Sequence, residues 1–338
     1  MINWQTRLLE IWLAGILAGI PCAASADEKT RPPNNAELES LVGEALPRPI
    51  QIVEWQAGEP PKYNLTIYAV LPKPYQPENL KSLADCLGIK GEPQRLPATF
   101  IYHPGYWIKE TNPTNKGVYA SLIFSETSGM IRYGSGEDNH KWDLKNHKPL
   151  AQGVPDEQEA LSRTLALLPA LGISTNDLEH LPDGRLKYAT STEGTWYNER
   201  NNKSERKRYI RQINIEFWQK IHDGASVLPM GSGGMLRAGY ISGGRLAEIE
   251  MVFRNVKSIG QAKAKTSGEI IQMLKRGEGW SFHAGVPDKL AVTQCSLVYP
   301  QANATTKQGV LWPFYSLSVV AVNNGETNSF RIYEPLDQ

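Results

Sequence analysis

The chain has 338 residues, 41% of them hydrophobic, so it is long enough to bury a sizeable core. Its 36 basic and 35 acidic residues leave a formal net charge of +1. This balance gives no support to binding of nucleic acid by the chain as a whole, and no nucleic-acid partner is expected.

Residues 1–26 predict a cleavable export signal. Arg7 closes a short polar start, residues 11–20 form an apolar run, and Ala24-Ser25-Ala26 offers the small residues that signal peptidase prefers. The apolar run is well short of the roughly 20 residues that span a bilayer. We therefore expect cleavage after Ala26 and a secreted or periplasmic protein without a stable membrane span. Acylation of Cys22 is the lesser alternative, because Pro21 does not suit such a site.

Proline is dense in residues 27–62, which predicts an exposed lead-in segment with little regular structure. Ordered structure is expected to begin near Tyr63. From there we predict a first α+β domain over residues 63–150 and a second over residues 151–338. The expected fold class is α+β, with antiparallel sheets that are each packed with a helix, in two tandem similar halves.

Apolar residues at helical spacing predict three helices, at Pro77–Leu87, from near Asp156 to Gly172, and at Ser267–Arg276. Pro169 should bend or shorten the last turn of the second helix. The third helix has a capping box over Thr266–Glu269 and a terminating Gly277. The first two helices both end on Leu-Gly-Ile, 84 residues apart (171 minus 87). This similarity indicates a weak internal repeat, with chance as the alternative.

Strands are predicted where β-prone residues alternate or cluster between turn residues, at 64–71, 99–102, 118–124, 130–133, 211–217, 235–241, 247–253, 290–299 and 311–322. The clearest alternation places Ile213, Ile215 and Phe217 on one face of a half-buried strand, beneath a helix. Residues 212–253 should form an antiparallel meander, with a tight turn at Ser242-Gly243-Gly244.

The stretch Asn198–Arg211 carries six basic residues. A solvated hairpin tip is the preferred interpretation. Binding of an anionic polymer is the alternative, but it would need a wider basic face with interleaved aromatic residues.

After removal of residues 1–26 the chain retains Cys86 and Cys295. Outside the cytoplasm they could form one disulfide. We expect two unpaired thiols, because the helix that holds one and the strand that holds the other need not meet.

Residues 212–335 resemble PepSY-type domains, the propeptide modules of thermolysin-like proteases and YycH/YycI-type regulatory proteins. The resemblance is carried by residues 215–224 (IEFWQKIHDG), 227–229 (VLP), the glycine-rich turn 231–234, residues 253–256 (FRNV) and the later 297–299 (LVY) and 311–315 (LWPFY). It implies a few antiparallel strands wrapped around a helix, and binding or inhibition of a partner protein without catalysis.

Recognisable catalytic signatures are absent from the sequence. There is no His-Glu-x-x-His pair, no Gly-x-Ser-x-Gly elbow and no phosphate-binding loop that ends in Lys-Ser or Lys-Thr. Residues 231–234 are better explained as a turn than as an anion site. The cluster of His140, Asp143 and His147 is better explained as a solvated loop than as a metal site. No catalytic, cofactor-binding or metal-binding residue is assigned, and no cofactor is expected.

Two classes of function follow from these observations. The first is an exported, non-catalytic binding or regulatory module that acts on an unknown protein partner, with an exposed apolar patch or sheet edge. The second is an extracellular hydrolase of unrecognised type, with paired carboxylates in a groove that contains aromatic residues.

Overall fold

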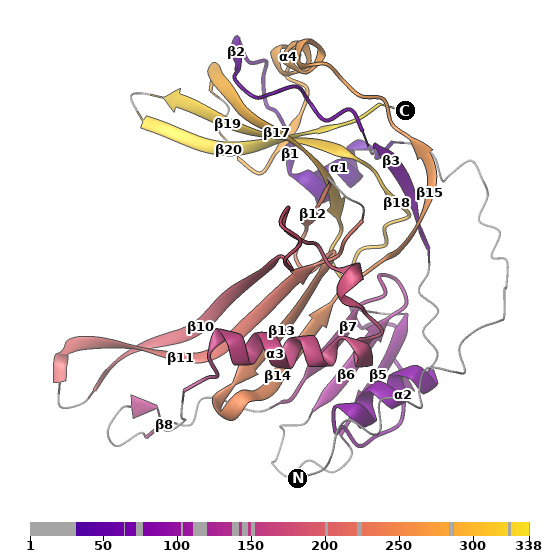
Figure 1. Cartoon of the computed structure of the whole chain (residues 1–338), viewed down its shortest axis with the longest axis vertical. Coiled ribbons are helices and arrows are strands. Elements are labelled where there is room, and N and C mark those ends of the chain that lie inside the picture. Colours follow the sequence, from indigo (N-terminus) through magenta and orange to yellow (C-terminus); the bar gives the residue numbers. More distant parts are fainter. Residues whose placement is uncertain are drawn as a thin grey trace.

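A computed structural model describes residues 32–63, 65–71, 77–102, 104–110, 120–136, 142–143, 148–149, 153–199, 202–221, 225–283, 285, 287–323 and 326–337. The predicted signal segment 1–26 lies outside these residues, and so do His140 and His147. The described chain is a sheet-rich α+β fold. Figure 1 shows two large sheets at opposite ends of the long axis, with a small sheet at one side between them.

The first large sheet has seven strands, in the order β1 (Glu44–Ala45), β16 (Trp280–Ser281), β20 (Glu326–Pro335), β19 (Phe314–Asn323), β17 (Lys289–Gln301), β12 (Ser226–Pro229), with β2 (Ile52–Trp55) also paired to β17. Strand β17 pairs antiparallel with β19 but parallel with both β2 and β12. The expectation of purely antiparallel sheets is therefore wrong here. One edge of β17 pairs with β19. Its other edge pairs with β2 at one end and with β12 at the other, over four residues each.

The second large sheet has eight strands, in the order β10 (Tyr188–Glu199), β11 (Asn202–Trp218), β13 (Met235–Ile241), β14 (Arg245–Met251), β7 (Ile131–Gly134), β6 (Ser121–Ser125), β5 (Gly105–Lys109), β4 (Gln94–Arg95). Every pairing in it is antiparallel. The small sheet contains β15 (Asn255–Gln261), β3 (Thr66–Leu71) and β18 (Val310–Leu311), and a short pair is formed by β8 (Trp142–Asp143) and β9 (Lys148–Pro149).

The predicted division at residues 150 and 151 falls inside the eight-stranded sheet. Strands β4 to β7 precede that division, and β10, β11, β13 and β14 follow it, yet hydrogen bonds between β7 and β14 join the two sets. The helices on either side of the division, α2 (Pro77–Cys86) and α3 (Glu157–Leu167), also share one hydrophobic core. The internal similarity of two tandem halves stays a prediction.

The lead-in segment contains more order than its proline content predicts. Helix α1 (Asn35–Val42) starts at a capping box, in which Glu37 N donates to Asn34 Oδ1 at 3.0 Å and Asn34 N donates to Glu37 Oε2 at 2.7 Å. Its Leu38, Leu41 and Val42 are buried against the seven-stranded sheet. Residues 34–46 contain no proline, so a helix can form there. Ordered structure therefore begins well before Tyr63.

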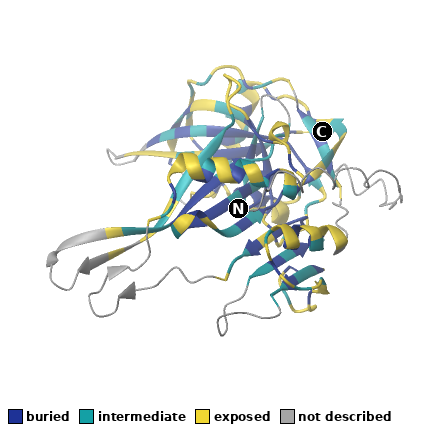
Figure 2. Ribbon diagram, turned by 60° about the horizontal axis from the view of Figure 1, so that its bottom comes forward, coloured by how far each residue is buried: buried dark blue, intermediate teal, exposed yellow. Residues whose placement is uncertain are grey.

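Helices α3 and α4 (Ser267–Arg276) end at the local sequence signals that predicted their ends. Pro169 ends α3 at Leu167, and a short 3-10 turn then closes at Gly172, whose φ is 68°. Helix α4 has the predicted capping box, and it ends at Gly277 with φ 79°. In Figure 2 these helices show exposed outer faces above the buried strands of the sheets.

The predicted meander forms from β11, β13 and β14. Ile213, Ile215 and Phe217 are buried in the core that α3 covers, so the predicted facing of this strand is confirmed. The opposite face is polar but not fully solvated, because Asn214 is 0% exposed and its amide donates to Ser191 Oγ.

Two strand predictions need correction. Residues 99–102 form a turn, in which Phe100 N donates to Pro97 O, and the chain pairs only from Gly105 onward. The predicted strand 311–322 is divided at Trp312-Pro313, where proline lacks the N–H that a sheet requires. The first piece, β18, pairs with β3 of the small sheet, whereas the second, β19, pairs in the seven-stranded sheet.

Arg254 links the two large sheets. It lies between β14 and β15, and its side chain donates to Oε1 of Gln301, the last residue of β17, at 3.3 Å and to Ala302 O, just beyond that strand, at 2.9 Å. Gln219, after β11, holds the Arg254 backbone by accepting from its N–H and donating to its carbonyl. Arg254 is 3% exposed, and burial lowers its pKa to about 10.

Candidate functional site

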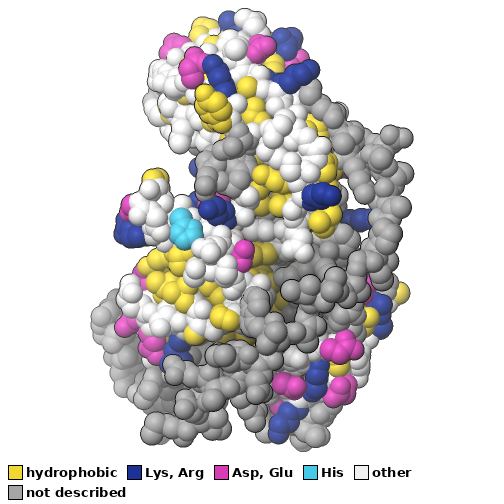
Figure 3. Space-filling model, turned by 45° about the vertical axis from the view of Figure 1, so that its right-hand side comes forward, with side chains coloured by type: hydrophobic (Ala, Val, Ile, Leu, Met, Phe, Trp, Pro, Cys, Tyr) yellow, Lys and Arg dark blue, Asp and Glu magenta, His cyan; other side chains and the backbone are white. Residues whose placement is uncertain are grey.

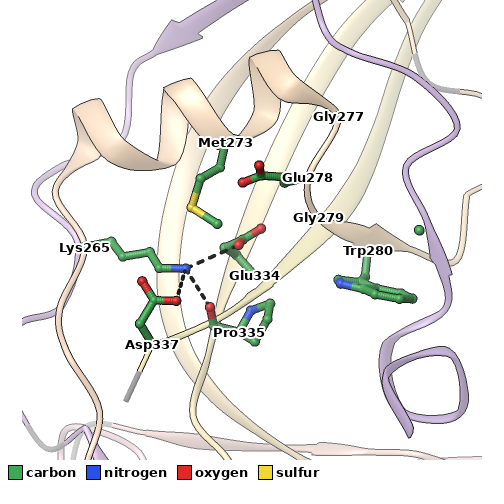
Figure 4. A pocket seen from close by; sticks show the side chains of 10 residues that line it. Lys265, Met273, Gly277, Glu278, Gly279, Trp280, Glu334, Pro335 and Asp337 are labelled. Carbon is green, nitrogen blue, oxygen red and sulfur yellow. Dashed lines mark hydrogen bonds and ion pairs between the residues drawn. The ribbon is translucent and has the colours of Figure 1, made fainter. Parts of the chain in front are cut away.

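The first candidate site is a pocket of about 270 Å³ between the C-terminal end of α4 and the end of β20 (Figure 4). It is lined by Ala45, Lys265, Met273, Gly277, Glu278, Gly279, Trp280, Glu334, Pro335 and Asp337. Gly277 ends the helix in a left-handed conformation and so turns the chain toward β16. Gly279, with φ 120°, continues this turn along the pocket wall, and a Cβ there would lie 3.0 Å from Ile332 Cγ2.

A buried ion pair forms the floor of the pocket. The side chains of Lys265 and Glu334 are 5% and 3% exposed. Lys265 Nζ donates to Pro335 O at 2.8 Å and lies 3.4 Å from both Glu334 Oε1 and Asp337 Oδ1. Glu334 Oε2 is buried and has no hydrogen-bond partner among the described residues. A buried carboxylate oxygen of this kind favours an additional donor.

Glu334 and Glu278 have opposite pKa shifts in the pocket. Burial raises the pKa of Glu334 to about 7, against the opposing effect of Lys265, and the nearby Glu278 and Asp337 add to the rise. The pKa of Glu278 is lowered, chiefly because Arg276 donates to both of its carboxylate oxygens at 2.6 and 2.7 Å. The pocket can therefore hold a cationic group or exchange a proton near neutral pH.

Sequence reasoning missed this pocket. Lys265 stands just before a helix cap, and Glu334 stands beyond the last predicted strand. The two are 69 residues apart and meet only because β20 returns beside α4. No spacing pattern within either segment signals that contact.

The second candidate site is the outer edge of the eight-stranded sheet. Strand β10 pairs with β11 along its length, and no described strand pairs with its other side. The short β9 approaches β10 without pairing to it. Figure 1 shows the β10–β11 ribbon extending beyond the end of α3. Thr192 is exposed on this edge strand, and the Trp196 side chain is 53% exposed.

The ribbon is basic and is fixed to the sheet by charged contacts. Across both strands and their turn, residues 188–218 contain six basic and four acidic residues, a local net charge of +2 (6 minus 4), and all six basic residues lie within 200–211. By contrast, basic and acidic side chains are interspersed on the face that Figure 3 shows. Glu193 of β10 accepts from Arg237 of β13 at 2.7 Å and lies 3.5 Å from Arg211 of β11. These contacts span three neighbouring strands and hold the base of the ribbon.

The predicted hairpin over residues 198–211 is thus the outer part of this ribbon, although its side chains from 197 to 207 are not described. Residues 231–234 form the expected turn, in which Gly233 N donates to Met230 O and Met235 N donates to Ser232 O. Within the described ranges no group of three His, Cys, Asp or Glu side chains could hold a metal ion. His140 and His147 are outside those ranges.

Cys86 and Cys295 are free thiols, as predicted, and they belong to different layers, one in α2 and the other in β17. Burial raises the pKa of Cys295 to about 12 and that of Cys86 less strongly. Neither thiol is therefore activated as a nucleophile by its surroundings.

In the part of the chain that the structure describes, no helix has the length and apolar character needed to cross a membrane. No family model matches the sequence, and no curated protein matches it. The fold is similar to the crystal structure of an uncharacterized protein from Eubacterium rectale ATCC 33656, with 8% identity and a TM-score of 0.42, over 84% of this chain and 86% of that one. A likeness this distant carries no functional argument.

Proposed function

We propose that this protein is an exported, non-catalytic module that binds a partner protein by accepting an extended segment of that partner as an added strand on β10. The observation that carries the proposal is the edge position of β10 over 12 residues. Unpaired backbone N–H and C=O groups along such an edge are a template for strand addition. The resemblance to PepSY-type modules, which implies binding of a partner protein, is consistent with this function.

The charge of the ribbon favours an acidic partner segment. An added strand would lie two strand spacings, or about 10 Å, from the basic residues of β11. That distance is close to the screening length of about 8 Å at physiological salt. The attraction between the basic residues and an acidic segment should therefore be modest and should weaken as the salt concentration rises. A partner segment with alternating β-prone and acidic residues fits this edge best.

Strand addition can be tested with proline at neighbouring positions. Consecutive N–H groups of an edge strand point alternately to the neighbouring strand and to the open side. Of Ser191→Pro and Thr192→Pro, the one whose N–H points to the open side should keep the sheet hydrogen bonds and be the more stable of the two. It should nevertheless bind an acidic, threonine- and valine-rich decapeptide more weakly than the alanine variant at the same position, which accounts for the loss of the side chain. A lysine-containing version of the peptide serves as the control ligand. If the more stable proline variant bound the acidic peptide as well as that alanine variant does, strand addition on β10 would be refuted.

The position of a native partner can be tested separately. A photo-crosslinking residue at Thr192 should capture a protein from the exported fraction, whereas the same residue at the exposed Ser162 of α3 should not. Equal capture from both positions would contradict docking at the edge strand.

An extracellular hydrolase is the second candidate, and one observation favours it. The pKa values of Glu334 and Glu278 are shifted in opposite directions in one pocket, which is the usual arrangement of an acid and a base pair. Hydrolysis of fluorogenic glycosides or peptides that is lost in both Glu334→Gln and Glu278→Gln would support this function. Activity that is unchanged in both variants would exclude this pocket as its site.

A further inference from the structure

We propose that the pocket between α4 and β20 binds a primary alkylammonium group, such as the side chain of lysine. This site is separate from the β10 edge, and the proposal does not rest on strand addition there. The central observation is the buried Oε2 of Glu334, an acceptor without a partner among the described residues. In Figure 4 this carboxylate lies between α4 and β20 beside the side chain of Met273, with Lys265 on its other side.

The charges around Glu334 select a cation. The acidic groups near it are Glu278 and Asp337, and the basic groups are Lys265 and, acting more weakly, Arg276. With Glu334 ionised, three negative charges face two positive ones, so the group carries a net charge of −1 (2 minus 3). One bound ammonium would make the group neutral and would satisfy Oε2. An anion would add to the excess of negative charge.

The geometry favours an ammonium over a guanidinium. Lys265 already occupies the Oε1 side of the carboxylate, at 3.4 Å, which leaves Oε2 as the available oxygen. A guanidinium binds best when both oxygens accept together, whereas an ammonium is a compact donor that can use one. The described residues also include no group of acidic side chains that could hold a metal ion.

The size and lining of the pocket suit an aliphatic stem. Its volume of about 270 Å³ is far above the roughly 10–15 Å³ that a cavity needs to hold one water. Met273 and Pro335 supply apolar surface for methylene groups. Gly279 contributes by lacking a side chain, since a Cβ at this position would lie 3.4 Å from Glu334 Oε2. Any larger residue there would enter the space that we assign to the ligand.

Binding should depend on pH in a defined direction. The ammonium pairs with the ionised form of Glu334, whose pKa is about 7. The ionised fraction rises from about one tenth at pH 6 to about nine tenths at pH 8. The affinity for an alkylammonium should therefore increase about tenfold over this interval. Glu278 stays ionised throughout because its pKa is lowered, so it should not add to the change.

The probes are n-butylammonium, with n-butanol as a neutral control of similar shape, titrated into the full chain and followed by calorimetry. The Met273 methyl signal reports occupancy of the pocket directly by NMR. We expect butylammonium to bind and to shift that signal, and butanol to do neither. Comparing Nα-acetyl-lysine methylamide with 1,4-diaminobutane then distinguishes a lysine of a protein from a free diamine as the natural source.

The matched variants are Glu334→Gln and, as control, Glu54→Gln, which removes an exposed carboxylate of the same sheet. Glu334→Gln should weaken butylammonium at least tenfold at pH 8 and abolish the pH dependence, whereas Glu54→Gln should change neither. If Glu334→Gln fails to fold, Asp337→Asn provides a milder test, with a loss of several fold. Binding that is equal for butanol and butylammonium, or independent of pH in the wild type, would overturn the proposal.

Discussion

Replacement of Phe217 by alanine tests which face of the central meander is buried. Phe217 is 0% exposed and lies opposite Leu236 of β13, with its ring 6.2 Å from that of Tyr188. Truncation of a fully buried phenylalanine costs about 3 to 5 kcal/mol through lost transfer free energy and the cavity left behind. The loss of the ring pair, worth about 0.5 to 1.5 kcal/mol, places the expected cost in the upper half of this range.

The neighbouring Glu216 provides the matched control. Its carboxylate faces the opposite side of the sheet, 3.8 Å from Arg237 Nε and 3.4 Å from Ser191 Oγ. Ion pairs this loose contribute about 1 kcal/mol or less, so Glu216→Gln should cost little. Urea unfolding followed by tryptophan fluorescence would measure both variants, with the dependence on urea expected to stay unchanged. Equal losses of unfolding free energy would refute the facing that buries Phe217 beneath α3.

Three further predictions concern other parts of the chain. The raised pKa of Glu334, from 4.5 to about 7, means that the folded protein holds a proton that the unfolded chain has already released. Stability from this group is therefore full below pH 4.5 and falls by up to about 3 kcal/mol as the pH rises through 7. Urea unfolding at pH 5 and 8 should show this loss in the wild type but not in Glu334→Gln, and an equal loss in both would contradict it. Arg254→Met should cost about 1 to 3 kcal/mol, because it leaves the buried carbonyl of Ala302 without its donor. A loss below about 1 kcal/mol in the same assay would show that this link is dispensable. Mass spectrometry of the exported protein should find a chain that starts after Ala26, and a chain that starts at Met1 would disprove cleavage.

Features that depend on a few neighbouring residues could be predicted from the sequence. The capping box at Thr266 and the glycine at 277 set both ends of α4, because a helix ends where its last backbone groups find local partners. The alternation of Ile213, Ile215 and Phe217 assigned the buried face of β11, because successive side chains of a strand point to opposite sides.

Features that depend on distant segments were decided by the tertiary structure. Parallel pairing of β2 and β12 with β17 joins residues that are more than 70 positions apart, and no local pattern encodes it. The burial of α1 depends on the seven-stranded sheet that covers it, so proline content alone misjudged that segment. The same holds for the pocket, since Lys265 and Glu334 belong to separate elements. The raised pKa of Glu334 and its unpartnered Oε2 follow from burial, which only the packed fold supplies.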